Sequence, residues 1–252
     1  MLLVVVFCTF ALAALAVGLQ LFTLHKVRRV HLHAFELLEH GRVTRLEVEH
    51  LFNQLQSLSL LERTLAMPQA LPPTRGWAGS PDFLLFAARH ALAHKPKVAV
   101  ECGSGVSTVV LARCMQMVGH GHLFSLEHDP VYAKKTRQLL LEHGLEAWAD
   151  VIDAPLVADP TSTPWYDESM FPDAMRDIGL LVVDGPPDDV GRLARYPALP
   201  RLLSRMDGHF TVIVDDAARP DETERVARWT QEIRGTTSST APAEKGLAVV
   251  CR

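Results

Sequence analysis

The residues best suited to chemistry are a carboxylate and two glycines that follow one strand-like run. In the stretch VAVECGSGVST, apolar residues lead into Glu101 and then into Gly103, Ser104 and Gly105 before a helical pattern begins. Glycines at a strand-to-helix turn let a ligand approach the backbone amides at a helix N-terminus. The carboxylate suits a ligand that carries an ammonium or sulfonium charge. We therefore expect a binding site for a cationic small molecule at this turn.

A second carboxylate, Glu127, ends the next strand-like run, HLFSLEHD. An acidic residue at this place can accept hydrogen bonds from both ribose hydroxyls of an adenosine. A nicotinamide dinucleotide would use the same features, but its fingerprint requires Gly or Ala where this chain has Thr108, and Glu101 suits a pyrophosphate poorly. The residues favour a cationic nucleoside, and a nicotinamide-dependent oxidoreductase is the alternative.

Two further strand-like runs end in carboxylates that can meet at one edge of a sheet. The run DIGLLVVDGPP contains Asp184, and the run HFTVIVDD ends in Asp215 and Asp216. Like charges at close range are costly unless something neutralises them. A divalent cation such as Mg²⁺ would do so, and it would also lower the pKa of a substrate hydroxyl. In the competing interpretation, Asp215 and Asp216 cap the helix that begins after Pro220 or form a turn.

Alternating strand and helix patterns predict an α/β fold with a doubly wound parallel sheet that positions these residues. Strands are expected at residues 97–102, 122–127, 150–152, 178–184, 209–215 and 246–251. Helices are expected at residues 81–94, 107–117, 130–144, 196–205 and 220–234, and residues 159–177 are expected to be loop. In such a fold the carboxyl ends of the strands form the ligand crevice, so Asp184 should face the reacting centre.

At the glycine turn the sequence resembles the class I S-adenosylmethionine-dependent methyltransferases. Residues 101–105, ECGSG, look like their E/D-x-G-x-G first motif, and Glu127 looks like their ribose-binding acid. The resemblance covers about residues 72–252 and implies a Rossmann-like, seven-stranded sheet whose last strand, GLAVVCR, is antiparallel. It also implies S-adenosylmethionine as cosubstrate, with the turn and Ser107 at its methionine portion and Asp153 at its adenine.

The acidic cluster resembles that of the catechol-type O-methyltransferases, whose metal ligands end the fourth and fifth strands. Those enzymes usually carry Asp-Asn where this chain has Asp215 and Asp216. The resemblance implies O-methylation with Asp184 as the catalytic residue, which orients the acceptor or helps Asp215 and Asp216 to hold Mg²⁺ or another divalent cation. A membrane-anchored scaffold with a degenerate pocket is the interpretation from a different class, and the intact glycine turn and Glu127 count against it.

The first 24 residues contain no charged side chain and are long enough to span a bilayer as one helix. A cleaved signal peptide is the alternative, but the basic residues Lys26, Arg28 and Arg29 follow the apolar run, whereas a signal peptide carries them before it. By the positive-inside rule, these residues place the rest of the chain in the cytoplasm. We therefore expect a single-pass membrane protein with a transmembrane helix at residues 1–24.

A helical stem is expected at residues 25–67, as one helix or as two that are broken near Gly41. Apolar residues recur there every three or four positions and form one stripe. The stripe consists of Val48, Leu51, Leu55, Leu58, Leu61 and Leu65. It predicts packing against the chain's own globular domain or, alternatively, a coiled coil that makes a homodimer.

The catalytic domain is expected to occupy residues 68–252. Its entry loop, LPPTRGWAGSPDF, resembles a feature of bacterial methyltransferase-like proteins that carry the same kind of N-terminal anchor. Arg75 and Trp77 in this loop are candidates for closing the active site. The alternatives are a solvated charge for Arg75 and packing at the edge of the sheet for Trp77.

Composition excludes some classes of function. The formal net charge of −4 provides no basic surface for nucleic acid, and the four cysteines lie far apart, which suggests neither a zinc site nor a disulfide framework. The sequence does not define the methyl acceptor, because variable loops build the acceptor pocket in this fold. A small molecule, a glycan and a lipid-linked compound are all open candidates.

Overall fold

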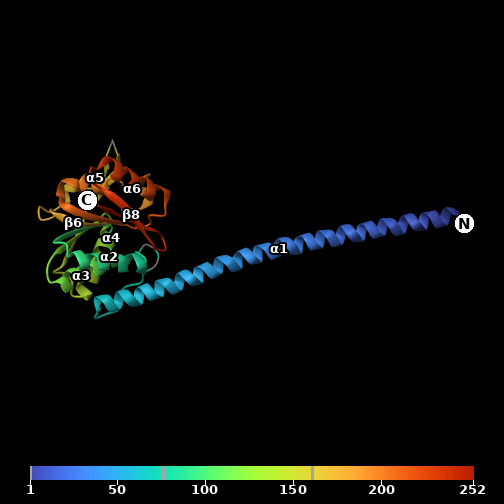
Figure 1. Cartoon of the computed structure of the whole chain (residues 1–252), viewed down its shortest axis with the longest axis horizontal. Helices are drawn as coiled ribbons and strands as arrows, with labels where there is room; N and C mark the ends of the chain where they lie inside the picture. The colour runs from blue at the N-terminus through green and yellow to red at the C-terminus, as the bar shows by residue number, and fades with distance from the viewer. Residues whose placement is uncertain (1, 75, 77, 160–161) are drawn as a thin grey trace. The chain divides into compact units, whose positions relative to one another are not determined.

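The computed structural model describes residues 2–74, 76, 78–159 and 162–252. The chain divides into two compact units, Met1–Phe52 and Asn53–Arg252. The second unit contains the sheet (Figure 1). Every residue of the expected ligand site also belongs to this unit.

One helix, α1 (Leu2–Leu65), accounts for the first unit and continues into the second. It runs without interruption through Gly41. Its apolar N-terminal part is long enough to cross a membrane by length and composition, with a mean hydropathy of 2.0 over the most apolar window and none of that window buried. A signal sequence passes the same test, so this finding is weak evidence for a membrane span.

The apolar stripe of α1 is buried only at its C-terminal end. Leu61 and Leu65 are fully buried in the core of the second unit, whereas Val48, Leu51 and Leu55 are exposed. Packing against the chain's own domain therefore accounts for the last part of the stripe. The coiled coil between two copies stays a prediction for the exposed part.

The second unit is built on a sheet of seven strands in the order β3-β2-β1-β6-β7-β9-β8. Pairing is parallel from β3 to β7, and β9 runs antiparallel to both of its neighbours. The strands are β1 (Val98–Cys102), β2 (His122–Glu127), β3 (Ala149–Asp153), β6 (Ile178–Val183), β7 (Met206–Val214), β8 (Thr237–Ala241) and β9 (Leu247–Cys251). This arrangement confirms the predicted doubly wound sheet with an antiparallel last strand.

Helices cover both faces of the sheet, and each face has its own apolar core. The helices are α2 (Pro81–His94), α3 (Val106–Val118), α4 (Pro130–Glu142), α5 (Ala198–Leu202) and α6 (Pro220–Glu232). The cluster beneath α2 and α3 contains Leu84, Val109 and Leu111, and the cluster beneath α5 and α6 contains Leu199 and Trp229. In Figure 1, α2 and α3 lie on one side of the sheet and α5 and α6 on the other.

The expectation of a loop at residues 159–177 was wrong in its first part. An antiparallel hairpin forms there from β4 (Leu156–Asp159) and β5 (Ser162–Tyr166), followed by a short 3₁₀ helix, Glu168–Met170. Pro164 within β5 removes a backbone donor and argues against a strand, but a two-stranded hairpin tolerates such a loss at an edge. Strand β8 was also missed, because the exposed edge sequence TSSTA has no apolar alternation.

Candidate active site

The glycine turn after β1 requires glycine at its first position. Gly103 has a positive φ of 90°, and a Cβ atom there would lie 3.2 Å from the backbone nitrogen of Gly185. The Gly103 amide donates to the Leu126 carbonyl at 2.9 Å, which ties the turn to the end of β2. The segments after β1 and β6 therefore approach each other closely, and Gly105 then begins α3 as its N-cap residue.

Glu101 is linked to this turn by hydrogen bonds. The Glu101 side chain is fully buried, and its Oε2 accepts hydrogen bonds from Thr108 Oγ1 at 2.6 Å and from Ser125 Oγ at 2.9 Å. Thr108 Oγ1 in turn accepts from the Gly105 amide at 2.9 Å. Thr108, which the sequence offered only as an argument against a dinucleotide, thus links the carboxylate to the glycine turn.

Burial raises the pKa of Glu101 to about 7. The hydroxyls of Ser107, Thr108 and Ser125 act in the opposite direction, because hydrogen bonds favour the ionised form. The second carboxylate oxygen, Oε1, is buried and has no hydrogen-bond partner among the described residues. Glu101 therefore retains one unused acceptor beneath the turn.

Glu127 is buried at the end of β2, and both of its carboxylate oxygens are occupied. Oε2 accepts from the amide and the hydroxyl of Ser104 at 2.9 and 2.8 Å, and Oε1 accepts from the amides of His128 and Asp129 at 2.9 and 3.0 Å. These four bonds fill the lone-pair sites of a carboxylate. A ribose hydroxyl could reach Oε2 if it replaced the Ser104 hydroxyl, which also lies 3.0 Å from Thr136 Oγ1.

Asp153 ends β3 next to Glu127, since the two residues are paired in register. The Asp153 side chain is about half exposed and forms an ion pair with Arg137 at 2.7 Å. The carboxylate that was expected at the adenine therefore already has Arg137 as its partner. The residues expected at the cosubstrate nevertheless lie at the carboxyl ends of β1, β2 and β3, in the turn before α3 or, for Ser107, in the first turn of α3.

The three aspartates expected near the acceptor converge at the same edge. Asp184 follows β6, and Asp215 and Asp216 follow β7, and one carboxylate oxygen from each lies within 4.8 Å of the others. Asp215 and Asp216 are 0% and 3% exposed. The Asp184 side chain is 17% exposed, which makes it the most accessible of the three.

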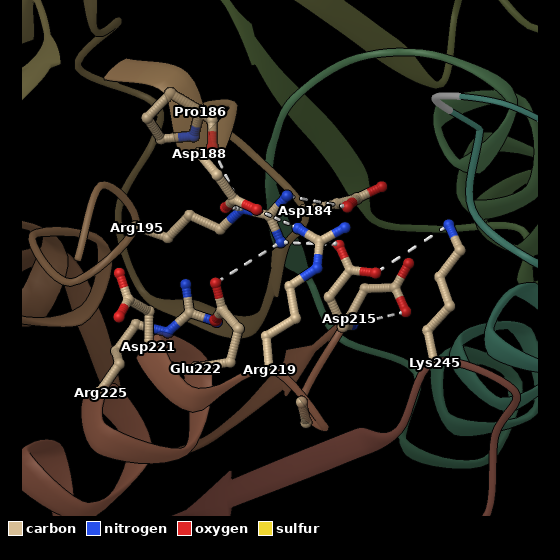
Figure 2. A network of polar contacts seen from close by, with 12 residues as sticks. Asp184, Pro186, Asp188, Arg195, Asp215, Arg219, Asp221, Glu222, Arg225 and Lys245 are labelled. Atoms are coloured by element: carbon tan, nitrogen blue, oxygen red, sulfur yellow. Dashed lines mark hydrogen bonds and ion pairs between the residues drawn. The ribbon is translucent and has the colours of Figure 1, made fainter. Parts of the chain in front are cut away.

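Basic side chains that were not anticipated surround this acidic cluster (Figure 2). Arg195 is only 5% exposed, and its guanidinium lies 3.5 Å from Asp184 Oδ1 and 3.3 Å from Asp216 Oδ2. Its Nε also donates to the Pro186 carbonyl at 3.1 Å. Arg219 lies 3.1 Å from Asp216, and Lys245 lies 4.0 Å from it. Arg195 was missed in the sequence analysis, because arginines are seldom buried.

Burial and the charge of a neighbouring carboxylate raise the pKa of two of these aspartates, Asp184 and Asp215. Burial raises the pKa of Asp184 to about 8, the charge of Asp215 raises it further, and Arg195 opposes both effects. The pKa of Asp215 is raised to about 6 by burial and by the neighbouring charge of Asp216. At neutral pH the cluster therefore retains a proton, and Asp184 is the group that can release or accept it.

Three further residues bear on the candidate active site. Arg75 and Trp77, the candidates for closing the site, lie outside the described residues. Tyr166 of β5, which was not anticipated, is 1% exposed and reaches the segment after β6, where a Cβ atom on Gly185 would lie 2.7 Å from the Tyr166 hydroxyl. The predicted loop hid this residue, because a loop side chain gives no pattern that fixes its direction.

Comparison with known proteins gives a consistent picture. Residues 100–217 match a family model described as a methyltransferase domain. This range contains the glycine turn, Glu127 and the acidic cluster. No match is found among curated protein sequences.

Solved structures show the same fold at low sequence identity. The methyltransferase PaMTH1 from Podospora anserina, bound to SAH, is 15% identical with a TM-score of 0.55, and the match covers 77% of this chain and 86% of that one. An O-methyltransferase from Bacillus cereus in complex with SAH is 16% identical with a TM-score of 0.52 and coverages of 78% and 90%. The O-methyltransferase TomG from Streptomyces achromogenes, in complex with SAM, is 16% identical with a TM-score of 0.51 and coverages of 77% and 88%. At these identities the likeness concerns the fold.

Proposed function

We propose that this chain, whose residues 100–217 match a family model described as a methyltransferase domain, transfers a methyl group from S-adenosylmethionine to a hydroxyl of an acceptor. One observation carries the proposal. A glycine turn at a helix N-terminus, a buried ribose-type carboxylate and an aspartate with a raised pKa lie along adjacent strands at one edge of the sheet. An oxidoreductase would share the first two features but has no evident use for the third.

In the proposed complex, each strand end holds a different part of the cosubstrate, in the order of the strands in the sheet. Adenine lies toward Asp153 on β3, the ribose toward Glu127 on β2, and the methionine portion over the Gly103 turn on β1. The backbone amides at the start of α3 favour a carboxylate there. The sulfonium then faces the end of β6, where Asp184 lies.

In the proposed transfer, Asp184 accepts the proton of the acceptor hydroxyl. The hydroxyl oxygen forms a bond to the methyl carbon while the carbon–sulfur bond breaks, and the products are the methyl ether and S-adenosylhomocysteine. A pKa of about 8 for Asp184 suits a general base better than that of an ordinary aspartate, because a base acts best when its pKa lies near the working pH. Positioning of the two reactants supplies most of the remaining rate increase.

The acidic cluster suits a divalent cation by ligand type and spacing but not by charge. Three carboxylates converge, and Asp215 Oδ2 has no hydrogen-bond partner among the residues described. However, Arg195 and Arg219 already lie within 3.5 Å of Asp184 and Asp216, and a divalent cation would meet their positive charges. The neutralisation expected from Mg²⁺ is thus supplied by the chain itself, and we propose that transfer needs no metal ion.

The acceptor is proposed to be a hydroxyl-bearing compound that enters beside the β4–β5 hairpin. A cavity of about 450 Å³ lies there, and Trp165, Tyr166, Ser169 and Arg201 are among the residues that line it. Such a volume holds a small molecule or the end of a larger one. A small molecule, a glycan and a lipid-linked acceptor all agree with this mixed aromatic and polar lining.

The cosubstrate is tested by calorimetric titration of the full chain in detergent with S-adenosylmethionine and, separately, with NADH. We expect micromolar binding of S-adenosylmethionine and none of NADH. Glu127→Gln should weaken binding by about tenfold or more, because a hydrogen bond to a charged group contributes roughly 1.5–3 kcal/mol. Glu146→Gln, at an exposed position, is the matched control. Binding of NADH alone, by a chain with an unchanged melting curve, would contradict the proposal.

We further propose that the N-terminal part of α1 anchors the domain to a membrane, with the catalytic unit in the cytoplasm. The full chain should stay in the membrane fraction after an alkaline carbonate wash. The double substitution Leu15→Arg and Leu19→Arg should release it, because each charge at the centre of a span costs roughly 2.5–3.5 kcal/mol. Leu37→Arg with Leu38→Arg, at two exposed positions farther along the helix, should not. Release of both variants, or a mature chain that lacks the apolar segment by mass spectrometry, would refute the anchor.

A further inference from the structure

The β4–β5 hairpin places two aromatic residues in the buried layer at the carboxyl ends of the central strands. Trp165 and Tyr166 are 2% and 1% exposed, and their rings meet edge to face at 4.9 Å. They belong to the same apolar cluster as Cys102 at the end of β1 and Val183 at the end of β6. The hairpin is thus part of the wall of the proposed active site.

The hydroxyl of Tyr166 lies where the segments after β1 and β6 approach each other. A Cβ atom on Gly185 would lie 2.7 Å from this hydroxyl and 3.0 Å from the Cα atom of Gly103. The rings of Tyr166 and His128 are 6.4 Å apart, and His128 directly follows Glu127. The hydroxyl therefore lies beside the segment that carries Asp184, where this segment meets the glycine turn that is expected to receive the methionine portion of the cosubstrate.

This hydroxyl is a buried donor without a partner. No described residue forms a hydrogen bond with it, although Glu127 and Asp184 are near enough to affect its charge. Burial, reinforced by the negative charges of these neighbours, raises the pKa of Tyr166 well above its usual value. The side chain stays a neutral phenol and can donate one hydrogen bond. An unsatisfied buried donor lowers stability, so a ligand acceptor at this point would relieve a cost that the free chain carries.

We propose that the Tyr166 hydroxyl is a binding residue that donates a hydrogen bond to the methionine portion of S-adenosylmethionine. This inference rests on the proposed function. In this inference the β4–β5 hairpin helps the glycine turn to position the methionine end of the cosubstrate. The ring of Tyr166 packs with Trp165 and would be preserved in phenylalanine, so the hydroxyl can be tested without disturbing the wall of the site.

The experiment compares the full chain with Tyr166→Phe by calorimetry and thermal unfolding. We expect Tyr166→Phe to bind S-adenosylmethionine and S-adenosylhomocysteine about tenfold more weakly than the unmodified chain does. Binding of 5′-methylthioadenosine, which lacks the amino acid end, should change less than about twofold. The melting temperature without ligand should be equal or higher, because the substitution removes only an unpartnered donor. Tyr132→Phe, on the exposed part of α4, is the matched control and should change none of these values.

The outcomes separate this inference from the proposed function. If the unmodified chain binds S-adenosylmethionine and Tyr166→Phe binds it equally well, the role of Tyr166 is refuted and the function stands. If Tyr166→Phe lowers the melting temperature, or weakens 5′-methylthioadenosine to the same extent, the hydroxyl is structural and the inference fails. If the unmodified chain binds no S-adenosylmethionine, both proposals fall.

Discussion

Asp184→Asn is expected to lower kcat/KM for methyl transfer by about 10²–10⁴-fold, the usual contribution of a general base. Asparagine has nearly the same shape as aspartate but cannot accept a proton from the acceptor hydroxyl. Binding of S-adenosylmethionine should change little, because Asp184 lies beyond the methionine end of the proposed site. Single-turnover transfer to a screened acceptor, with calorimetry of the cosubstrate, measures the two effects separately. Asp173→Asn, at a fully exposed aspartate, is the control.

The pH dependence gives a second test of the same residue. With a pKa of about 8 in the folded chain, Asp184 is mostly protonated at neutral pH, so the rate should rise with pH and level off above about pH 8. Asp184→Asn should abolish this rise. A full rate at pH 6, or an unchanged pH profile in the variant, would exclude Asp184 as the base.

The same shift predicts how stability depends on pH. The pKa of Asp184 is raised from 3.8 in the unfolded chain to about 8 in the folded one, so the folded chain binds more protons between these values. The free energy of unfolding should therefore fall as pH rises from about 4 to about 8. Asp184→Asn removes the titrating group and should be more stable than the unmodified chain at pH 8. Urea unfolding at several pH values measures this dependence. The free energy of unfolding of the variant should change less with pH than that of the unmodified chain.

Much of the fold could be predicted because its signals are local. The strand at residues 122–127 and the helix at residues 81–94 have the expected bounds. The strand is a short apolar run, and the helix has Ser80 and Pro81 at its start, followed by a helical pattern. The hairpin was not predictable in the same way. Its strands are short, Pro164 interrupts one of them, and its stability comes from Trp165 and Tyr166, which pack against distant strand ends.

In the candidate site, the residues at the ends of the strands could be predicted from the sequence, but their partners could not. Strand order and the ends of apolar runs bring Glu127, Asp184 and Asp215 to one edge, and the sequence shows all three. The partners of these residues could not be predicted, because they come from segments without a pattern. Arg195 lies in a loop before α5, and its burial depends on the approach of the segments after β6 and β7. The possible site for Mg²⁺ or another divalent cation was inferred from the carboxylates alone, because the sequence does not show their guanidinium partners, and it stays a prediction.

Arg195→Met should lower the free energy of unfolding by about 3–5 kcal/mol, the usual effect of removing one partner from a buried ion pair. The substitution leaves Asp184, Asp216 and the buried Glu222 facing one another without the guanidinium that now lies within 4.0 Å of each. Arg219→Gln is the control, because Arg219 is about half exposed and its loss should cost at most about 1 kcal/mol. Urea unfolding of the three chains gives the comparison.

The same variant decides whether the acidic cluster is built for an arginine or for a metal ion. We expect the unmodified chain to bind no Mn²⁺ at micromolar concentration in paramagnetic resonance titrations. Arg195→Met should acquire a site, and Mn²⁺ should restore part of its lost stability, because the vacated carboxylates are hard oxygen ligands for such a cation. The opposite result, one Mn²⁺ site in the unmodified chain that Asp215→Asn abolishes, would show that Arg195 and the metal share the carboxylates. A carboxylate can contact a guanidinium and a cation through different oxygens. Comparing the Mn²⁺ affinities of the unmodified chain and of Arg195→Met therefore separates a cluster that holds arginine alone from one that holds arginine and a metal ion.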